Sequence, residues 1–197
     1  MSPTHSNQSP LLSIRLSFDV ISGKLKVPTT KVRLKSEEAI QYFKYKLNQI
    51  GEPSDSAMGR VKLMKLLFLA EAQSLKELNR PLFGDALFSY KNGPVLGALR
   101  KVAPIVNVGL APWKPNLLSE IETDVLVSIW SRHGRTSGAE LIEYTHASMF
   151  GWESPSIFER CIYNKPLNLE KLFEGLNLSD DQQLAIAEGY HFLATEA

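Results

Sequence analysis

The chain opens with a segment in which apolar and polar residues alternate. After a polar, Pro- and Ser-rich tail at residues 1–11, apolar side chains stand at every second position from Leu12 to Val20. This period of two is typical of a β-strand that buries one face. A Ser-Gly turn and a second, shorter alternation follow, so we predict an N-terminal β-hairpin extension over residues 12–35. Because isolated hairpins are marginal in water, it must dock on the rest of the domain, on a second copy of the chain or on a partner.

The pattern becomes helical at Ser36, which we expect to cap the first helix. Apolar side chains within residues 36–50 share one face, whereas residues 59–78 are apolar nearly all round, which predicts a central buried helix. A connector then leads to Pro94, a residue suited to the first turn of a short helix that ends near residue 102. Residues 103–118 hold three prolines, and we expect an irregular loop there.

Serines followed three residues later by Glu or Gln mark the starts of the later helices, because each side chain of such a pair can bond the backbone N–H of the other residue. The pairs Ser119–Glu122, Ser137–Glu140 and Ser179–Gln182 predict helices that end at Gly134, run through His146 and span residues 180–194, with a further short helix at 168–174. The predicted fold is mainly α: a compact multi-helix domain over residues 36–197 that follows the N-terminal hairpin, α+β overall.

The composition is that of an ordinary folded domain. Of the 197 residues, 44% are hydrophobic and 22% are charged, which excludes wholesale disorder, a collagen-like fibre and a coiled-coil rod. No apolar run reaches the roughly 20 residues that a bilayer span requires, and the N-terminal residues do not resemble a secretory signal. The single cysteine, Cys161, cannot form an internal disulfide and favours a reducing compartment. We therefore expect a cytoplasmic protein with no membrane partner.

The formal net charge of +1 conceals an asymmetry between the two halves of the chain. Residues 1–100 hold 15 Lys and Arg against 8 Asp and Glu, whereas the second half holds 7 against 13. Residues 24–35 contain five cations and no acid. Such a segment attracts phosphates or an acidic protein surface, although the same lysines also serve simply as solvated side chains that discourage aggregation.

Little in the chain points to catalysis or metal binding. The four histidines lack metal-ligand spacing, and no GxSxG, P-loop or GxGxxG motif is present. Ser148 lies two residues from His146, and residues two apart on a helix point to different faces. We expect no enzyme, no cofactor and no metal.

A helix–turn–helix is the alternative by spacing, formed by residues 119–146. It would make the protein a DNA-binding transcriptional or phage regulator. Its second helix, however, carries Glu140 and Glu143 and no Lys or Arg. Because cation contacts to phosphates supply much of the affinity for a duplex, the pattern favours two packed helices over a DNA reader.

Three segments in register resemble a known family, the Panacea domain of SocA-like antitoxins. The matching residues are Lys62, Leu63, Lys65, Leu66, Leu67, Phe68 and Ala70 in a buried helix, Pro81, Leu82 and Phe83 after it, Tyr90, Lys91, Gly93, Pro94 and Val95 in a turn, and Gly134, Ser137, Leu141, Thr145, His146 and Trp152 in the second half. The resemblance covers residues 36 to about 155 and leaves out the N-terminal hairpin.

The resemblance implies an antitoxin that binds and neutralises a toxin protein encoded beside it. One branch of the family is similar to a proteolytic adaptor, which adds a protease as a further partner, and homo-oligomers are left open. Tyr90, Lys91, Trp113 and Trp152 suit surface anchors, because such side chains combine apolar area with a polar group. His146 either pins the loop of Trp152 or contacts the partner directly. The candidate partner-binding residues are Lys24, Lys26, Arg33, Tyr90, Lys91, Gly93, Pro94, Val95, Trp113, His146 and Trp152.

Overall fold

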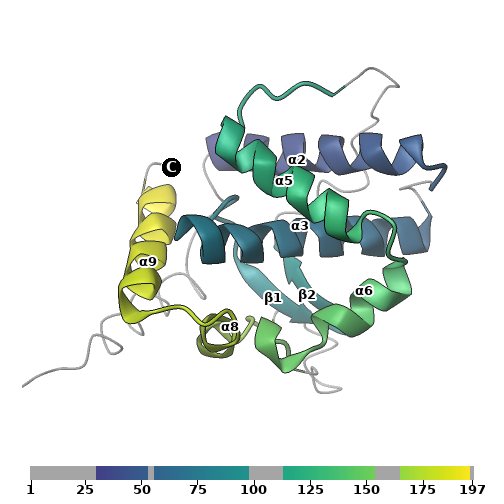
Figure 1. Ribbon diagram of the computed structural model, residues 1–197. Coiled ribbons are helices and arrows are strands. Elements are labelled where there is room, and N and C mark those ends of the chain that lie inside the picture. The colour runs from purple at the N-terminus through teal and green to yellow at the C-terminus, as the bar shows by residue number, and fades with distance from the viewer. Residues whose placement is uncertain (1–29, 53–55, 98–112, 154–164, 196–197) are drawn as a thin grey trace, which may run out of the picture.

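The computed structural model describes residues 30–52, 56–97, 113–153 and 165–195. Its helices are α2 (Thr30–Gln49), α3 (Ala57–Leu78), α5 (Glu120–His133), α6 (Gly138–Thr145), the 3-10 turn η1 (Ser148–Phe150), α8 (Leu169–Gly175) and α9 (Asp180–Thr195), and its strands are β1 (Leu87–Tyr90) and β2 (Gly93–Leu96) (Figure 1). This part of the chain is mainly α, as predicted, and none of its helices is long and apolar enough to cross a bilayer.

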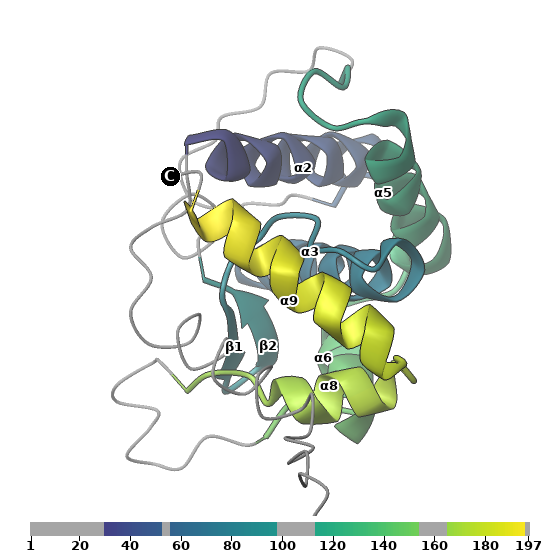
Figure 2. The same ribbon diagram turned by 90° about the vertical axis from the view of Figure 1, so that its left-hand side faces the viewer.

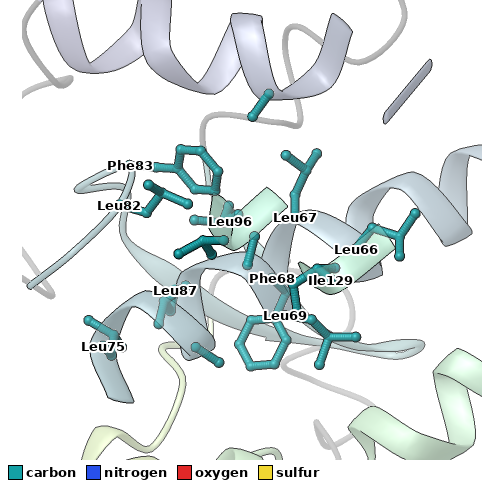
Figure 3. Packing of buried hydrophobic residues seen from close by; sticks show 14 of the residues in the cluster. Leu66, Leu67, Phe68, Leu69, Leu75, Leu82, Phe83, Leu87, Leu96 and Ile129 are labelled. Atoms are coloured by element: carbon teal, nitrogen blue, oxygen red, sulfur yellow. The ribbon is translucent and has the colours of Figure 1, made fainter. Parts of the chain in front are cut away.

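Helix α3 lies at the centre of the fold. Helix α2 runs along one side of it and the β-hairpin lies on the other, while α5 and α6 pack against it as well (Figures 1 and 2). The leucines predicted to be core, Leu63, Leu66 and Leu67, are at most 1% exposed. Figure 3 shows side chains of α3 packed among those of the connector, the hairpin and α5. Burial on several sides explains why the helix is apolar nearly all round.

The segment after the connector forms a hairpin, so the helix predicted from Pro94 is wrong where the structure describes it. Strands β1 and β2 pair antiparallel, with Leu87 opposite Leu96 and Ser89 opposite Pro94. Residues 165–167 join β1 on its other side, where Ser89 N–H donates to the carbonyl of Lys165. Strand β2 is therefore an edge in the described residues, a place where a proline's missing N–H is tolerated. The predicted remainder of that helix, residues 98–102, lies outside the described residues.

The helix predicted to start after Ser36 is α2, and it begins at Thr30, six residues before that predicted cap. The Ser36 hydroxyl instead donates to the buried carboxylate of Asp85 across a distance of 2.9 Å. Residues 30–35, the last residues of the predicted hairpin extension, are therefore helical. Ser36 does not cap the helix, because its hydroxyl is hydrogen-bonded to the distant Asp85. Residues 12–29, which carry the predicted strands, lie outside the described residues.

The predicted capping pairs are confirmed. In each pair the serine hydroxyl accepts a hydrogen bond from the backbone N–H of the Glu or Gln three positions later. The side chain of that Glu or Gln accepts a hydrogen bond from the serine N–H. The helices α5, α6 and α9 begin directly after these serines, and the short helix predicted at 168–174 is α8. These signals act over three residues, so tertiary packing has little power to override them.

A buried polar cluster ties the connector between α3 and β1 to the surrounding helices. The carboxylate of Glu71 accepts hydrogen bonds from the N–H groups of Leu82 and Phe83 and from the hydroxyl of Tyr190 on α9. Burial raises the pKa of Glu71 to about 7 despite these bonds, and burial likewise raises the pKa of Asp85 to about 7. The connector that leads into the hairpin is thus anchored to α3, α9 and, through Ser36, α2.

Candidate functional site

Three parts of the chain meet at Gly93, at the tip of the hairpin. Its backbone has φ of +96°, and a Cβ there would lie 2.6 Å from Lys65 Nζ, 3.0 Å from His146 Cδ2 and 3.0 Å from Thr145 Oγ1. Both the left-handed backbone and the lack of space therefore demand glycine. The close approach brings α3 and the end of α6 onto the hairpin tip.

Lys65 is the buried cation of this site. It is 1% exposed, and its Nζ donates to the carbonyl of Pro94 across 2.9 Å. Burial lowers the pKa of its ammonium to about 7, because a charge removed from water is disfavoured. In the sequence analysis Lys65 is one of the residues that resemble the family's buried helix, but it is not among the candidate partner-binding residues. The feature of the sequence that could have identified it is a lysine within a helix that is apolar nearly all round and is therefore buried on most faces.

His146 and Trp152 form the second half of the site. Their rings are stacked, with centroids 3.7 Å apart and planes inclined by 4°, and the indole Nε1 of Trp152 donates to the carbonyl of Tyr90 at 2.9 Å. Burial and the nearby Lys65 lower the pKa of His146, against a hydrogen bond to the backbone of Asn92 that raises it, and the net shift favours the neutral imidazole. His146 thus pins the Trp152 loop, and Trp152 holds the hairpin tip.

The loop before Trp152 also requires a glycine. Gly151 has φ of +66°, and a Cβ there would collide with the backbone of Asn168 at the start of α8. The Gly151 carbonyl accepts a hydrogen bond from Asn168 N–H. This close backbone contact sets the path on which Trp152 reaches the ring of His146.

A small pocket of about 220 Å³ opens beside the hairpin tip. Its lining comes from α3 (Val61, Met64 and Lys65) and from the hairpin (Tyr90, Lys91, Asn92 and Val95). Lys91 and Asn92 are exposed at its mouth, whereas Lys65 and Val95 are buried. Most of the lining is apolar, and no carboxylate contributes to it.

Most of the predicted partner-binding residues lie together at the hairpin tip. Those brought together are Tyr90, Lys91, Gly93, Pro94, Val95, His146 and Trp152. Trp113 is not among them, because it packs against Tyr42 of α2 with ring centroids 4.8 Å apart. Lys24 and Lys26 lie outside the described residues, and Arg33 lies in α2.

The site suits binding more readily than catalysis. Sequence reasoning missed Val61, Met64, Lys65 and Asn92, which become neighbours only when the hairpin folds back on α3. Among the residues that the structure describes, no group of three or more His, Cys, Asp and Glu side chains could hold a metal ion. The described groups offer aromatic faces, an apolar hollow and two amines.

The family comparison matches this region. The model of the antitoxin SocA-like Panacea domain matches residues 63–153, which begin two residues before Lys65 and end one residue after Trp152. No curated protein and no solved structure is significantly similar to the chain. The match therefore confirms the resemblance over residues 63–153, which are similar to the Panacea domain of SocA-like antitoxins.

Proposed function

We propose that this protein is an antitoxin that neutralises a toxin encoded beside it, and that the hairpin-tip site is the centre of the binding surface. The family match over residues 63–153 supports an antitoxin role and a regulatory rather than a catalytic one. The observation that carries the proposal is the convergence of Tyr90, Lys91, His146 and Trp152 within the matched residues. The toxin is bound by direct protein–protein contact.

The site is held in place before any partner arrives. The ring of Trp152 is stacked on that of His146, and its indole N–H is hydrogen-bonded to the carbonyl of Tyr90. Lys65 donates a hydrogen bond to the carbonyl of Pro94. A preorganised surface loses less conformational entropy on binding than a mobile one. Tyr90 and Trp152 are half-buried, and Tyr and Trp are among the residue types that supply most binding energy in protein interfaces.

The basic stretch at residues 24–35 is a second element of the proposed surface. Its cations, including Lys24, Lys26 and Arg33, favour an acidic partner through charge complementarity. In this proposal the stretch adds long-range attraction and speeds association, while the hairpin tip supplies specificity. Both act in the cytoplasm.

The helix–turn–helix alternative has less support. The face of α6 that is open to solvent carries Glu140 and Glu143, and both would be repelled by DNA phosphates. The buried side of the same helix packs on α3 through Leu141. We therefore place the partner surface at the hairpin tip and not on α6.

The test is co-expression of the adjacent reading frame with and without this protein. We expect the neighbour to arrest growth alone, and the antitoxin to restore growth and co-purify with it. Lys91→Glu should abolish rescue, whereas Lys76→Glu, on the exposed far end of α3, should not. A neighbour that is harmless alone, or that is never bound, overturns the proposal.

Two further readouts separate the finer versions of this function. If toxin levels fall when the antitoxin is present and recover in a protease-deficient host, the protein also acts as a proteolytic adaptor. A shift of its own promoter fragment that weakens steeply with salt would indicate the DNA-binding role instead.

A further inference from the structure

The pocket beside the hairpin tip has the dimensions of a receptor for one side chain. Its volume of about 220 Å³ is below the roughly 300–1,000 Å³ of typical small-molecule sites. Val61, Met64 and Val95 supply apolar walls. An apolar side chain that enters this space exchanges contact with water for apolar contact, which the hydrophobic effect favours.

The pocket lining contains two lysines and no acidic residue. Lys91 stands at the mouth and Lys65 lies inside, with no carboxylate in the lining. The hydrogen bond of Lys65 goes to a neutral carbonyl, and an ammonium offers three donors. A carboxylate brought close to the mouth would therefore gain a partner at Lys91 and compensate the buried amine as well.

We infer that the pocket receives an apolar side chain of the toxin that stands next to an Asp or Glu in the toxin sequence. The apolar group fills the space between α3 and β2, and the neighbouring carboxylate pairs with Lys91. This inference rests on the proposed function, because it names the chemistry by which the same site recognises its partner.

Two peptides test the pocket without any toxin. The probes are acetyl-Asp-Leu-Asp-amide and its uncharged counterpart acetyl-Asn-Leu-Asn-amide, titrated into the full chain labelled with ¹⁵N. We expect the acidic peptide to shift the Trp152 indole N–H and the Gly93 amide, and to bind about 5-fold more tightly than the neutral one at low salt. Equal affinities, or no shift with either peptide, would overturn the inference.

Variants then locate the effect in the pocket. Lys91→Glu should abolish the preference for the acidic peptide, and Met64→Trp, which fills the space, should weaken both peptides at least about 10-fold. Lys76→Glu is the matched control, because Lys76 is exposed on α3 roughly 18 Å beyond Met64 along the helix axis. If Met64→Trp fails to fold, Lys91→Glu on the exposed turn still decides the outcome.

The toxin itself separates the two proposals. If the neighbour-encoded protein binds the native chain and the Lys91→Glu and Met64→Trp variants equally well, the pocket inference and the placement of the surface at the hairpin tip fall, while the antitoxin function stands. If the acidic peptide binds as expected but the neighbour-encoded protein does not, the proposed function fails and the pocket remains a site for acidic peptides.

Discussion

The imidazole of His146 lies flat on the indole of Trp152, with ring centroids 3.7 Å apart. His146 caps the C-terminus of α6, and Trp152 follows η1, so this stack fastens the end of one helix to the loop beyond it. The indole N–H then reaches Tyr90 in the hairpin. Three segments that are distant in sequence are thereby held together at the candidate binding surface.

Trp152→Phe should destabilise the protein by about 1 kcal/mol through loss of the indole hydrogen bond to Tyr90. Trp113→Phe is the matched control, because the buried Nε1 of Trp113 has no partner among the described residues. Urea unfolding of both variants measures the difference. Equal losses would show that the hydrogen bond at the hairpin tip contributes nothing.

Gly93→Ala should cost about 2 kcal/mol or more, since it combines a positive φ with a collision between Cβ and Lys65 Nζ. Gly51 isolates the backbone part of this cost. It has φ of +73° and nothing within 4 Å of an added Cβ, so Gly51→Ala should cost only about 1 kcal/mol. Thermal unfolding of the two variants measures both losses. Similar losses of stability at the two positions would contradict the crowding at Gly93.

Stability should pass through a minimum near neutral pH. The folded pKa of Glu71 and of Asp85 is raised to about 7 from ordinary values of 4.5 and 3.8. Each contribution is therefore complete below its ordinary value and is lost as pH rises to 7. Lys65 has its folded pKa lowered to about 7, so the unfolded chain binds more protons between pH 7 and 10.5 and stability rises again there. Melting temperatures between pH 5 and 9 test this profile.

Glu71→Gln provides the control for that profile, because it removes one titrating group and retains an acceptor for the connector amides. The variant should show a smaller fall in stability between pH 5 and 7 than the native chain, with an unchanged rise above pH 7. Because the folded-state pKa of His146 is lowered, its titration opposes the fall in stability below pH 6.5. This contribution is the same in both proteins and therefore cancels when they are compared. An unchanged slope would contradict the role of Glu71.

Leu67→Ala should cost about 2–5 kcal/mol, because Leu67 is 1% exposed at the centre of the fold and truncation leaves a cavity. Leu184 on α9 is 44% exposed, and Leu184→Ala should change stability by less than about 0.5 kcal/mol. Chemical denaturation measures both. Comparable losses at the two positions would contradict the central place of α3.

The helix starts at Ser119, Ser137 and Ser179 could be predicted because each depends on hydrogen bonds that span three residues. The burial of α3 could be predicted as well, since apolar residues around a whole helix have no other stable environment. The helix predicted from Pro94 failed for the opposite reason. Pairing with residues 87–90 and packing of Leu96 on the core are long-range terms that the local preference of proline for a helix start does not include.

The sequence by itself determined a mainly helical fold, the caps of α5, α6 and α9, the buried central helix and the residue types of a candidate binding surface. Only the tertiary structure decided that Lys65 lies beneath Pro94, that Trp152 bonds to Tyr90 and that Trp113 belongs to another part of the molecule. Periodicity and caps are encoded within one or two turns of chain. A binding site is made by contacts between segments, and these depend on how every element packs.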